Sequence, residues 1–213
     1  SGFITDMGFE TYQKILAEAM EELGFETGIS SRSSGDNFVS DCTIETDQLA
    51  LIPDSYIDMT AEKIRIYKEL DSLTSEKDLI NMKNRLTDRF GKMPVELERL
   101  FDIVRIRQLG QKLGFEKIII KNGVMIAFFI TNPLSQYYRS DRFSKVLENV
   151  NLNPKLFEIK QPDGRLRIMV RNVDGISKAY DILKKLSLHI KADHTVFQRN
   201  CGVDDLCSER NIR

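Results

Sequence analysis

Hydrophobic residues recur along much of this chain at intervals of three and four, the spacing that places them on one face of an α-helix. The clearest stripe consists of Leu79, Met82, Leu86 and Phe90. Gly91 follows it directly, and a glycine just past the last apolar residue can adopt the left-handed conformation that closes a helix. Pro94 suits the first turn of a second helix, because the N–H that proline lacks would have no partner there. Residues 84–94 are therefore expected to form a corner between two helices.

The same periodicity predicts further helices on both sides of this corner. They cover residues 9–23, 60–73, 95–113, 139–149 and 173–186. Thr60 is expected to cap the helix over 60–73, whose inward residues are Ile64, Tyr67, Leu70 and Leu73. Ser75 followed by Asp78 resembles a capping box for the helix that carries the stripe.

Strands are expected where apolar residues recur at every second position instead of every third or fourth. Residues 42–52 alternate apolar and polar at first, as a half-buried strand does. Two hairpins follow, one of 117–121 with 124–130 around Asn122-Gly123, the other of 156–160 with 166–170 around Pro162-Asp163-Gly164. Asn-Gly between apolar β-formers is the strongest short hairpin signal.

Each hairpin is followed by one helix, so the second half of the chain contains two successive strand-strand-helix units, and no parallel crossover is required. The predicted fold class is α+β. A linker helix comes first, then a strand and a three-helix segment, then the two units. Together they form a mainly antiparallel or mixed sheet that helices cover on one side.

Serine and glycine mark the domain boundaries. We expect a helix within 1–26, a flexible linker over 27–41, a domain over 42–188, and a poorly structured tail over 189–213. The predicted N-terminal helix has no neighbouring element to pack against, so its partner is expected upstream or in another molecule.

The composition indicates a globular protein. Apolar residues make up 41% of the 213 residues, and 31 basic residues nearly balance 32 acidic ones, giving a net charge of -1. Whole-surface attraction to nucleic acid or to an anionic membrane is not expected from such a balance. No apolar run approaches the roughly 20 residues of a membrane span. Three cysteines are too few for a disulfide framework, which fits a reducing, cytoplasmic setting.

No catalytic motif is found. The chain contains no phosphate-binding GxxxxGK[ST] loop, GxSxG, HExxH, CxxC or EF-hand spacing, so neither an enzyme nor a cofactor is expected. The only metal-like set is His189, His194, Cys201 and Cys207. It lacks the short paired cysteine spacing of zinc sites, and incidental residues in a tail are the favoured interpretation.

Two groups of residues could contact nucleic acid. The helix over 95–113 carries four basic residues, Arg99, Arg105, Arg107 and Lys112, but acidic residues lie among them, as on an ordinary solvated helix. Tyr137 and Tyr138 could stack on bases, although partly buried tyrosines in a loop are favoured. Nucleic-acid contact is therefore kept only as the alternative function.

A resemblance to a known family rests on four segments in order. They are IPDSYI, RIYKEL, LTDRFGKMP and LFDIVRIRQLGQKLG, all between residues 52 and 114. This stretch resembles the C-terminal domain of the bacterial transcription-repair coupling factor. The first residues, SGFI with MGFETYQKIL, are similar to the segment that leaves the second motor lobe of that protein.

The resemblance implies a function for the parent protein and for this part. The parent would be an ATP-dependent DNA translocase that displaces stalled RNA polymerase and recruits excision repair. This chain would carry no ATPase site and would act as an autoinhibitory lid. It would fold back on an N-terminal module similar to the UvrB repair protein and cover the surface meant for UvrA. Its direct partners would be that module and the motor lobes, with no membrane. The alternative is a DNA-contacting accessory domain of a related helicase.

The resemblance also suggests which residues do this. Asp88, Arg89, Phe90 and Gly91 match the family's acid-arginine-phenylalanine-glycine run. The structural residues of the corner are expected to be Leu86, Phe90, Gly91 and Pro94. The polar residues Arg85, Asp88 and Arg89 are the candidates for interdomain contact, with Asp88 placed to pair with a basic surface. Arg85 departs from the acidic residue that some family members carry at that position, which argues against a purely acidic docking face.

Overall fold

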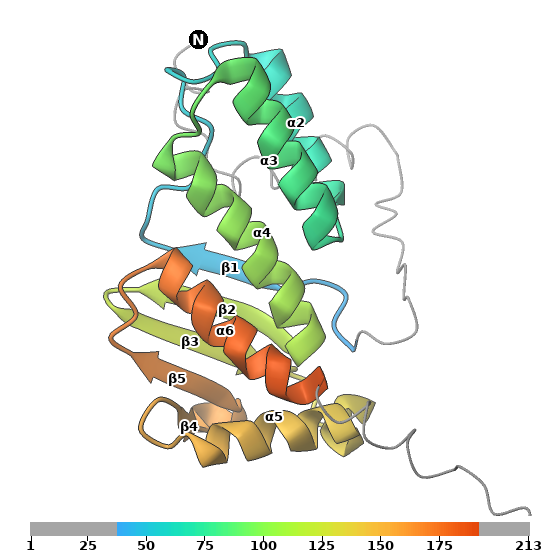
Figure 1. Ribbon diagram of the computed structural model, residues 1–213. Helices are drawn as coiled ribbons and strands as arrows, with labels where there is room; N and C mark the ends of the chain where they lie inside the picture. Colours follow the sequence, from blue (N-terminus) through green and yellow to red (C-terminus); the bar gives the residue numbers. More distant parts are fainter. Residues whose placement is uncertain (1–37, 192–213) are drawn as a thin grey trace, which may run out of the picture.

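The computed structural model describes residues 38–191, with side chains up to Leu188. A helical hairpin of α2 (Thr60–Ser72) and α3 (Glu76–Phe90) lies at one end, and a five-stranded sheet lies at the other. The long helix α4 (Val95–Leu113) runs from the hairpin onto the sheet, where α6 (Ile176–Lys191) lies beside it (Figure 1). The predicted helix within 1–26, most of the linker and the tail beyond 191 fall outside the described residues.

The sheet is mixed, which is one of the two arrangements that the sequence predicted. Its strand order is β1-β2-β3-β5-β4. The strands are β1 (Thr43–Thr46), β2 (Phe115–Lys121), β3 (Val124–Phe129), β4 (Glu158–Lys160) and β5 (Arg167–Arg171). The pair β1–β2 is parallel and the other pairs are antiparallel. The expectation that the two strand-strand-helix units need no parallel crossover is confirmed, because β2, β3, β4 and β5 pair with one another only antiparallel. The parallel crossover of this sheet instead connects β1, which precedes both units, to β2. The three helices α2, α3 and α4 are that crossover, because parallel neighbours need a long connection.

Both predicted hairpins and the two strand-strand-helix units are confirmed. In the β2–β3 turn, Asn122 and Gly123 have φ of 52° and 73°, the positive values that this turn type requires. The second hairpin turns through a short 3₁₀ segment, Pro162–Gly164. The helices that follow are α5 (Asp141–Leu152), after a 3₁₀ turn over Gln136–Arg139, and α6.

The first part of the domain differs from the sequence prediction in three places. The strand expected over 42–52 is only four residues long, because the chain leaves the sheet at Asp47 to reach the hairpin. Thr60 is the first residue of α2 rather than its cap, and the capping position is Met59, which makes no side-chain bond. Ile64 is exposed and Ile66 is buried in its place, because the inward face of α2 is set by its packing against both α3 and α4.

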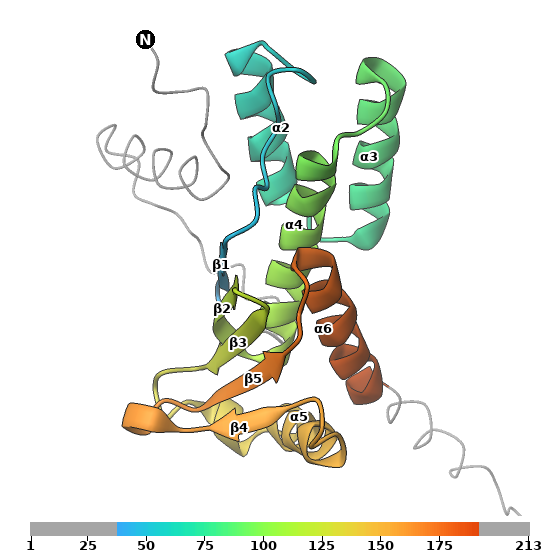
Figure 2. The same cartoon turned by 90° about the vertical axis from the view of Figure 1, so that its left-hand side faces the viewer.

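Helix α4 is buried on several sides because it lies between the hairpin, the sheet and α6 (Figure 2). Close contact with the sheet depends on small residues. A side chain at Gly110 would lie 2.4 Å from the sulfur of Cys42, and one at Gly114 would lie 2.2 Å from the ring of Tyr137. Burial raises the pKa of the Cys42 thiol to about 12, so this thiol stays protonated at neutral pH.

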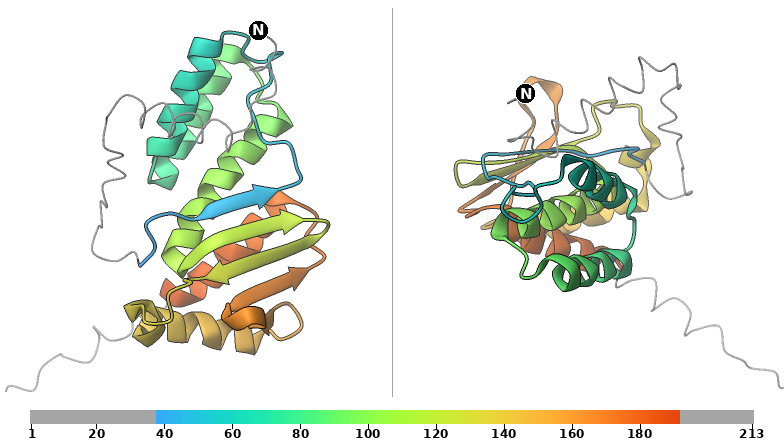
Figure 3. Two further views of the ribbon diagram at one scale, coloured as in Figure 1. Left: turned by 180° about the vertical axis from the view of Figure 1, so that it is seen from behind. Right: turned by 90° about the horizontal axis from the view of Figure 1, so that it is seen from above.

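Helices α4 and α6 cover one face of the sheet, in agreement with the one-sided cover that the sequence predicts. Viewed from behind, the strands lie in front of both helices, and no described helix covers the near face (Figure 3). The covered face carries the buried residues of the strands, such as Ile118, Ala127 and Ile168. The opposite face carries the alternate positions, which are partly exposed.

Candidate interdomain docking face

Helix α3 is fixed at both ends by local sequence. Ser75 caps its start, where the side-chain oxygen accepts a bond from the backbone N–H of Asp78 at 3.1 Å, so the N-cap half of the predicted capping box is confirmed. Gly91 ends it with a φ of 86°, and its N–H donates to the carbonyl of Thr87 at 2.9 Å. Pro94 lies at the capping position of α4, one residue before the first turn where the sequence suggested it.

Tyr56 holds the corner that follows α3, a role that the sequence did not indicate. Its hydroxyl donates to the carbonyls of Leu86 and Gly91 at 3.0 and 3.1 Å. Its ring lies 5.8 Å from that of Phe90, measured between centroids. Leu86 is buried, whereas Phe90 is only partly buried and also carries the guanidinium of Arg89 over its ring at 4.7 Å.

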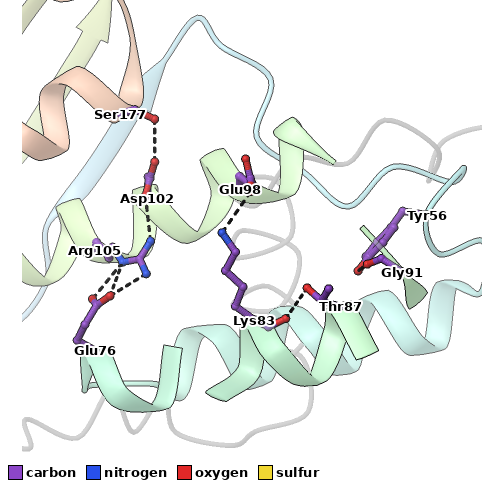
Figure 4. Close-up of polar contacts among 9 residues, drawn as sticks. All are labelled: Tyr56, Glu76, Lys83, Thr87, Gly91, Glu98, Asp102, Arg105 and Ser177. Carbon is purple, nitrogen blue, oxygen red and sulfur yellow. Dashed lines mark hydrogen bonds and ion pairs between the residues drawn. The ribbon is translucent and has the colours of Figure 1, made fainter. Parts of the chain in front are cut away.

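A polar clasp joins α3 to α4 and α6 (Figure 4). The guanidinium of Arg105 donates three bonds of 2.7 to 3.0 Å to the carboxylate of Glu76 at the start of α3. It also bonds Asp102 at 3.1 Å, and Asp102 accepts from the hydroxyl of Ser177 at 2.9 Å. Lys83 and Glu98 make a second, more exposed pair at 3.2 Å. The orientation of α3 is therefore fixed by contacts at its start and at its middle.

Two of the three candidate contact residues are already paired within the domain. Because α2 and α3 are antiparallel, Arg89 lies opposite the start of α2 and bonds Glu62 at 2.6 Å, while Arg85 pairs with Glu69. Hydrogen bonds from Arg65 and Arg89 lower the pKa of the Glu62 carboxyl, so it stays ionised. A hollow of about 190 Å³ lies between these pairs.

Asp88 differs from both arginines. At 3.6 residues per turn it lies about opposite the buried stripe of α3, on the line that faces solvent. The other residues on this line, Lys77, Asn81 and Asn84, are also exposed. Asp88 makes no ion pair with any residue that the structure describes. It is a carboxylate held on a rigid helix and free to meet a cation from elsewhere.

Two of the four basic residues of α4 are neutralised within the domain. Arg105 is bound by Glu76 and Asp102, and Arg107 by Asp41 and Asp71, with only 15% and 20% of the two side chains exposed. Tyr137 and Tyr138 pack within the domain and bond its backbone, in agreement with the favoured interpretation that they are loop tyrosines rather than base-stacking residues. Tyr137 is fully buried and donates to the carbonyl of Leu113, while Tyr138 is partly buried and donates to that of Ile130.

The metal-like residues lie almost entirely outside the part of the chain that the structure describes. Of the four metal-like residues, His189 lies in the last turn of α6, its side chain is not described, and the others lie beyond residue 191. Between residues 38 and 191, no three histidine, cysteine or acidic side chains gather as a metal site would require. No helix of that part is long and apolar enough to cross a membrane.

Comparison with known proteins identifies the domain. The TRCF domain family matches residues 46–140, which include α2, α3, α4 and the first hairpin of the sheet. This chain carries a TRCF domain. The TRCF match spans the corner at Gly91 and all three candidate contact residues, so the resemblance of this stretch to the C-terminal domain of transcription-repair coupling factors is confirmed.

Relatives and a solved structure extend the TRCF match over most of the chain. Transcription-repair-coupling factors of Staphylococcus epidermidis, Rickettsia conorii and Staphylococcus haemolyticus are 34%, 32% and 36% identical over 172, 190 and 185 residues. These alignments cover 80 to 88% of this chain but only 13 to 16% of the relatives. A crystal structure of the C-terminal domain of transcription-repair coupling factor has the same fold, with a TM-score of 0.58, 19% identity, and coverage of 71% of this chain and 94% of that one.

Sequence reasoning missed the acidic partners of the TRCF domain's arginines. Glu62 and Glu69 are seven residues apart on α2 and therefore share a face, and Arg85 and Arg89 are four apart on α3. With only residues 73–75 between the two helices, an antiparallel hairpin places the two pairs opposite each other. That matched spacing was the signal that could have found them.

Proposed function

We propose that this domain is an autoinhibitory lid of a transcription-repair coupling factor. The parent protein would be an ATP-dependent DNA translocase of the cytoplasm that displaces stalled RNA polymerase and recruits excision repair. The lid would dock on a UvrB-like N-terminal module and mask its UvrA-binding surface. Because this chain corresponds to a small part of the relatives that it matches, it would regulate the activity of other domains.

The solvent-facing line of α3 supports this proposal. A lid needs a rigid polar face that can be released, rather than a pocket. The Ser75 cap, Gly91 and the Arg105 clasp hold α3 in place, while Asp88 stays without an ionic partner in the described domain. Asp88 carries the proposal because it would pair with a cation on the module. Arg85 and Arg89, neutralised by Glu69 and Glu62, would contribute shape and hydrogen bonds around it.

Deleting the domain from the full-length parent tests the lid itself. Removal should increase binding of UvrA or the ATPase rate, because the masked surface is then free. Unchanged values in both assays would contradict the proposal. Salt-sensitive binding of duplex DNA by this chain would instead favour the alternative, a DNA-contacting accessory domain.

Asp88→Arg in the full-length parent tests the face. An exposed ion pair contributes about 1 kcal/mol, so charge reversal should raise UvrA binding by roughly fivefold or more without unfolding the domain. Asp181→Arg is the matched control, because Asp181 is an exposed carboxylate on α6 and is not part of the hairpin. Equal effects of the two variants would show that net charge, rather than this face, controls docking.

A further inference from the structure

The sheet face that α4 and α6 do not cover carries apolar and basic side chains in a regular arrangement. Side chains alternate along each strand, so every second residue of the three central strands faces away from the helices. We call these nine residues the outer sheet face: Lys117, Ile119 and Lys121 of β2; Val124, Ile126 and Phe128 of β3; Arg167, Met169 and Arg171 of β5. All nine are partly or largely exposed.

Strand register arranges these residues in three rows. Lys117, Phe128 and Arg167 are direct neighbours across the strands, as are Ile119, Ile126 and Met169, and as are Lys121, Val124 and Arg171. The apolar residues therefore form a cross centred on Ile126, and a cation occupies each of the four corners. An apolar centre with a charged rim is the anatomy of a protein interface.

The rim has more positive charge than the domain neutralises. Lys117 and Lys121 share Glu45, at 2.5 and 3.2 Å, on one side of the face. On the other side Glu158 takes Lys160 at 3.1 Å and Arg171 at 2.7 Å.

The fifth cation, Arg167, has no carboxylate partner among the described residues, and its Nε atom is buried without a hydrogen bond. Five cations thus face two carboxylates, in a chain whose net charge is -1. Bonds from these cations lower the pKa of both carboxyls, so they are ionised already and cannot supply more negative charge. A complementary partner must bring its own.

We propose that the outer sheet face is a second docking surface, which binds an amphipathic helix with an apolar stripe flanked by carboxylates, presented by another polypeptide. A helix fits because α4 and α6 already pack on the opposite face, and helices on both faces of a sheet are a stable layering. Three strands and five residues give an area of about 10 by 14 Å, which matches two to three turns of helix. An interface this small belongs to the weak, transient class of protein contacts.

Nucleic acid fits this face less well. Single-stranded nucleic acids bind on several aromatic side chains, and the apolar cross contains one aromatic residue, Phe128, among aliphatic and thioether groups. The ring of Phe128 is also occupied, because the guanidinium of Arg167 lies over it at 5.8 Å. The proposal does not rest on the lid function, since it concerns different elements from α3.

Titration of the 213-residue chain with a synthetic helical peptide tests the proposal. The probe is a peptide of about 18 residues with leucines at helical spacing and glutamates on both sides of that stripe. Its scrambled isomer and a thymidine oligonucleotide are the comparison probes. Binding is followed by fluorescence anisotropy of the labelled probe and by NMR shifts of the chain. Saturable binding of the amphipathic peptide, with shifts confined to β2, β3 and β5, is the expected result.

Substitutions on the outer sheet face test whether the peptide binds there. Ile126→Glu and Arg167→Glu should each weaken peptide binding at least about tenfold, whereas Leu134→Glu, at a residue that is 83% exposed in a loop, should leave it unchanged. Because a glutamate in the central strand β3 could unfold the sheet, circular dichroism is measured on each variant, and Arg167→Glu is the deciding one.

Four results would overturn the proposal. They are absence of saturable binding, equal binding of the scrambled peptide, preference for the oligonucleotide, and self-association of the chain that Arg167→Glu abolishes. The last would identify a second copy as the occupant. Because α3 is untouched in these variants, the Asp88→Arg assay separates failure of this proposal from failure of the lid.

Discussion

The α2–α3 hairpin and the five-stranded sheet are both attached to α4, but by different kinds of contact. On the sheet side, Gly110 and Gly114 let the helix approach Cys42 and Tyr137 so closely that no side chain fits between them. On the hairpin side, an ordinary apolar stripe is surrounded by arginine–carboxylate pairs at the surface. The sheet side therefore fixes the fold, whereas the outer line of α3 can change with little cost. A docking residue belongs on the second kind of surface.

The largest effect should distinguish two phenylalanines. Phe129 is buried in an aromatic cluster with Phe115, Tyr137 and Phe143, at centroid distances of 4.9 to 6.2 Å. Phe129→Ala should lower the free energy of unfolding by about 3–5 kcal/mol, because it opens a cavity in the core. Phe90→Ala, at the partly exposed end of α3, should cost only about 1–2 kcal/mol. Urea denaturation measures both, and equal losses would mean that the two halves are packed alike.

The second largest effect on stability is expected at Arg105, which joins α4 to α3 through Glu76. Arg105→Met should lower the free energy of unfolding by about 2 kcal/mol, because the half-buried Asp102 then loses its cation and Glu76 its three bonds. Lys83→Met removes the ion pair with Glu98, whose two side chains are 41% and 49% exposed. It should change the free energy of unfolding by less than about 0.5 kcal/mol. A loss for Arg105→Met no larger than that for Lys83→Met would contradict a structural role of the clasp.

A smaller effect should depend on pH. The pKa of Glu62 is lowered in the folded domain by bonds from Arg65 and Arg89. Its contribution is therefore fully present above its unfolded pKa of about 4.3 and is lost as the pH falls through the lower folded value. Glu62→Gln should flatten the fall of unfolding free energy below about pH 5. A variant whose unfolding free energy still falls as steeply below about pH 5 as that of the unaltered domain would contradict this assignment.

The smallest effect on stability is expected at Asp88. Asp88→Asn should change the free energy of unfolding by less than about 0.5 kcal/mol, since the carboxylate makes no contact in the described domain that would be lost. The same substitution should weaken docking in the full-length parent. A large loss of stability would show that Asp88 supports the helix and would remove it from the docking face.

How far the sequence predicted this domain depends on whether a feature is local. Leu79, Met82 and Leu86 lie where the period of α3 put them, Ser75 caps the helix, and Asn122-Gly123 turns the first hairpin. Such features depend on residues a few positions apart, so pattern and turn chemistry determine them. The same reasoning found the corner at Gly91 and placed Asp88 on the polar side of α3.

Long-range pairing was decided only in the tertiary structure. The parallel neighbour of β1 is β2, which begins some 70 residues later. No pattern in either segment indicates that the two strands pair. Ile66 replaced Ile64 in the core because α2 packs on two helices at once. Arg85 and Arg89 pair with Glu69 and Glu62 because the hairpin places α3 antiparallel to α2. The sequence by itself determined which faces each element has, and packing between distant elements determined which of those faces stayed free.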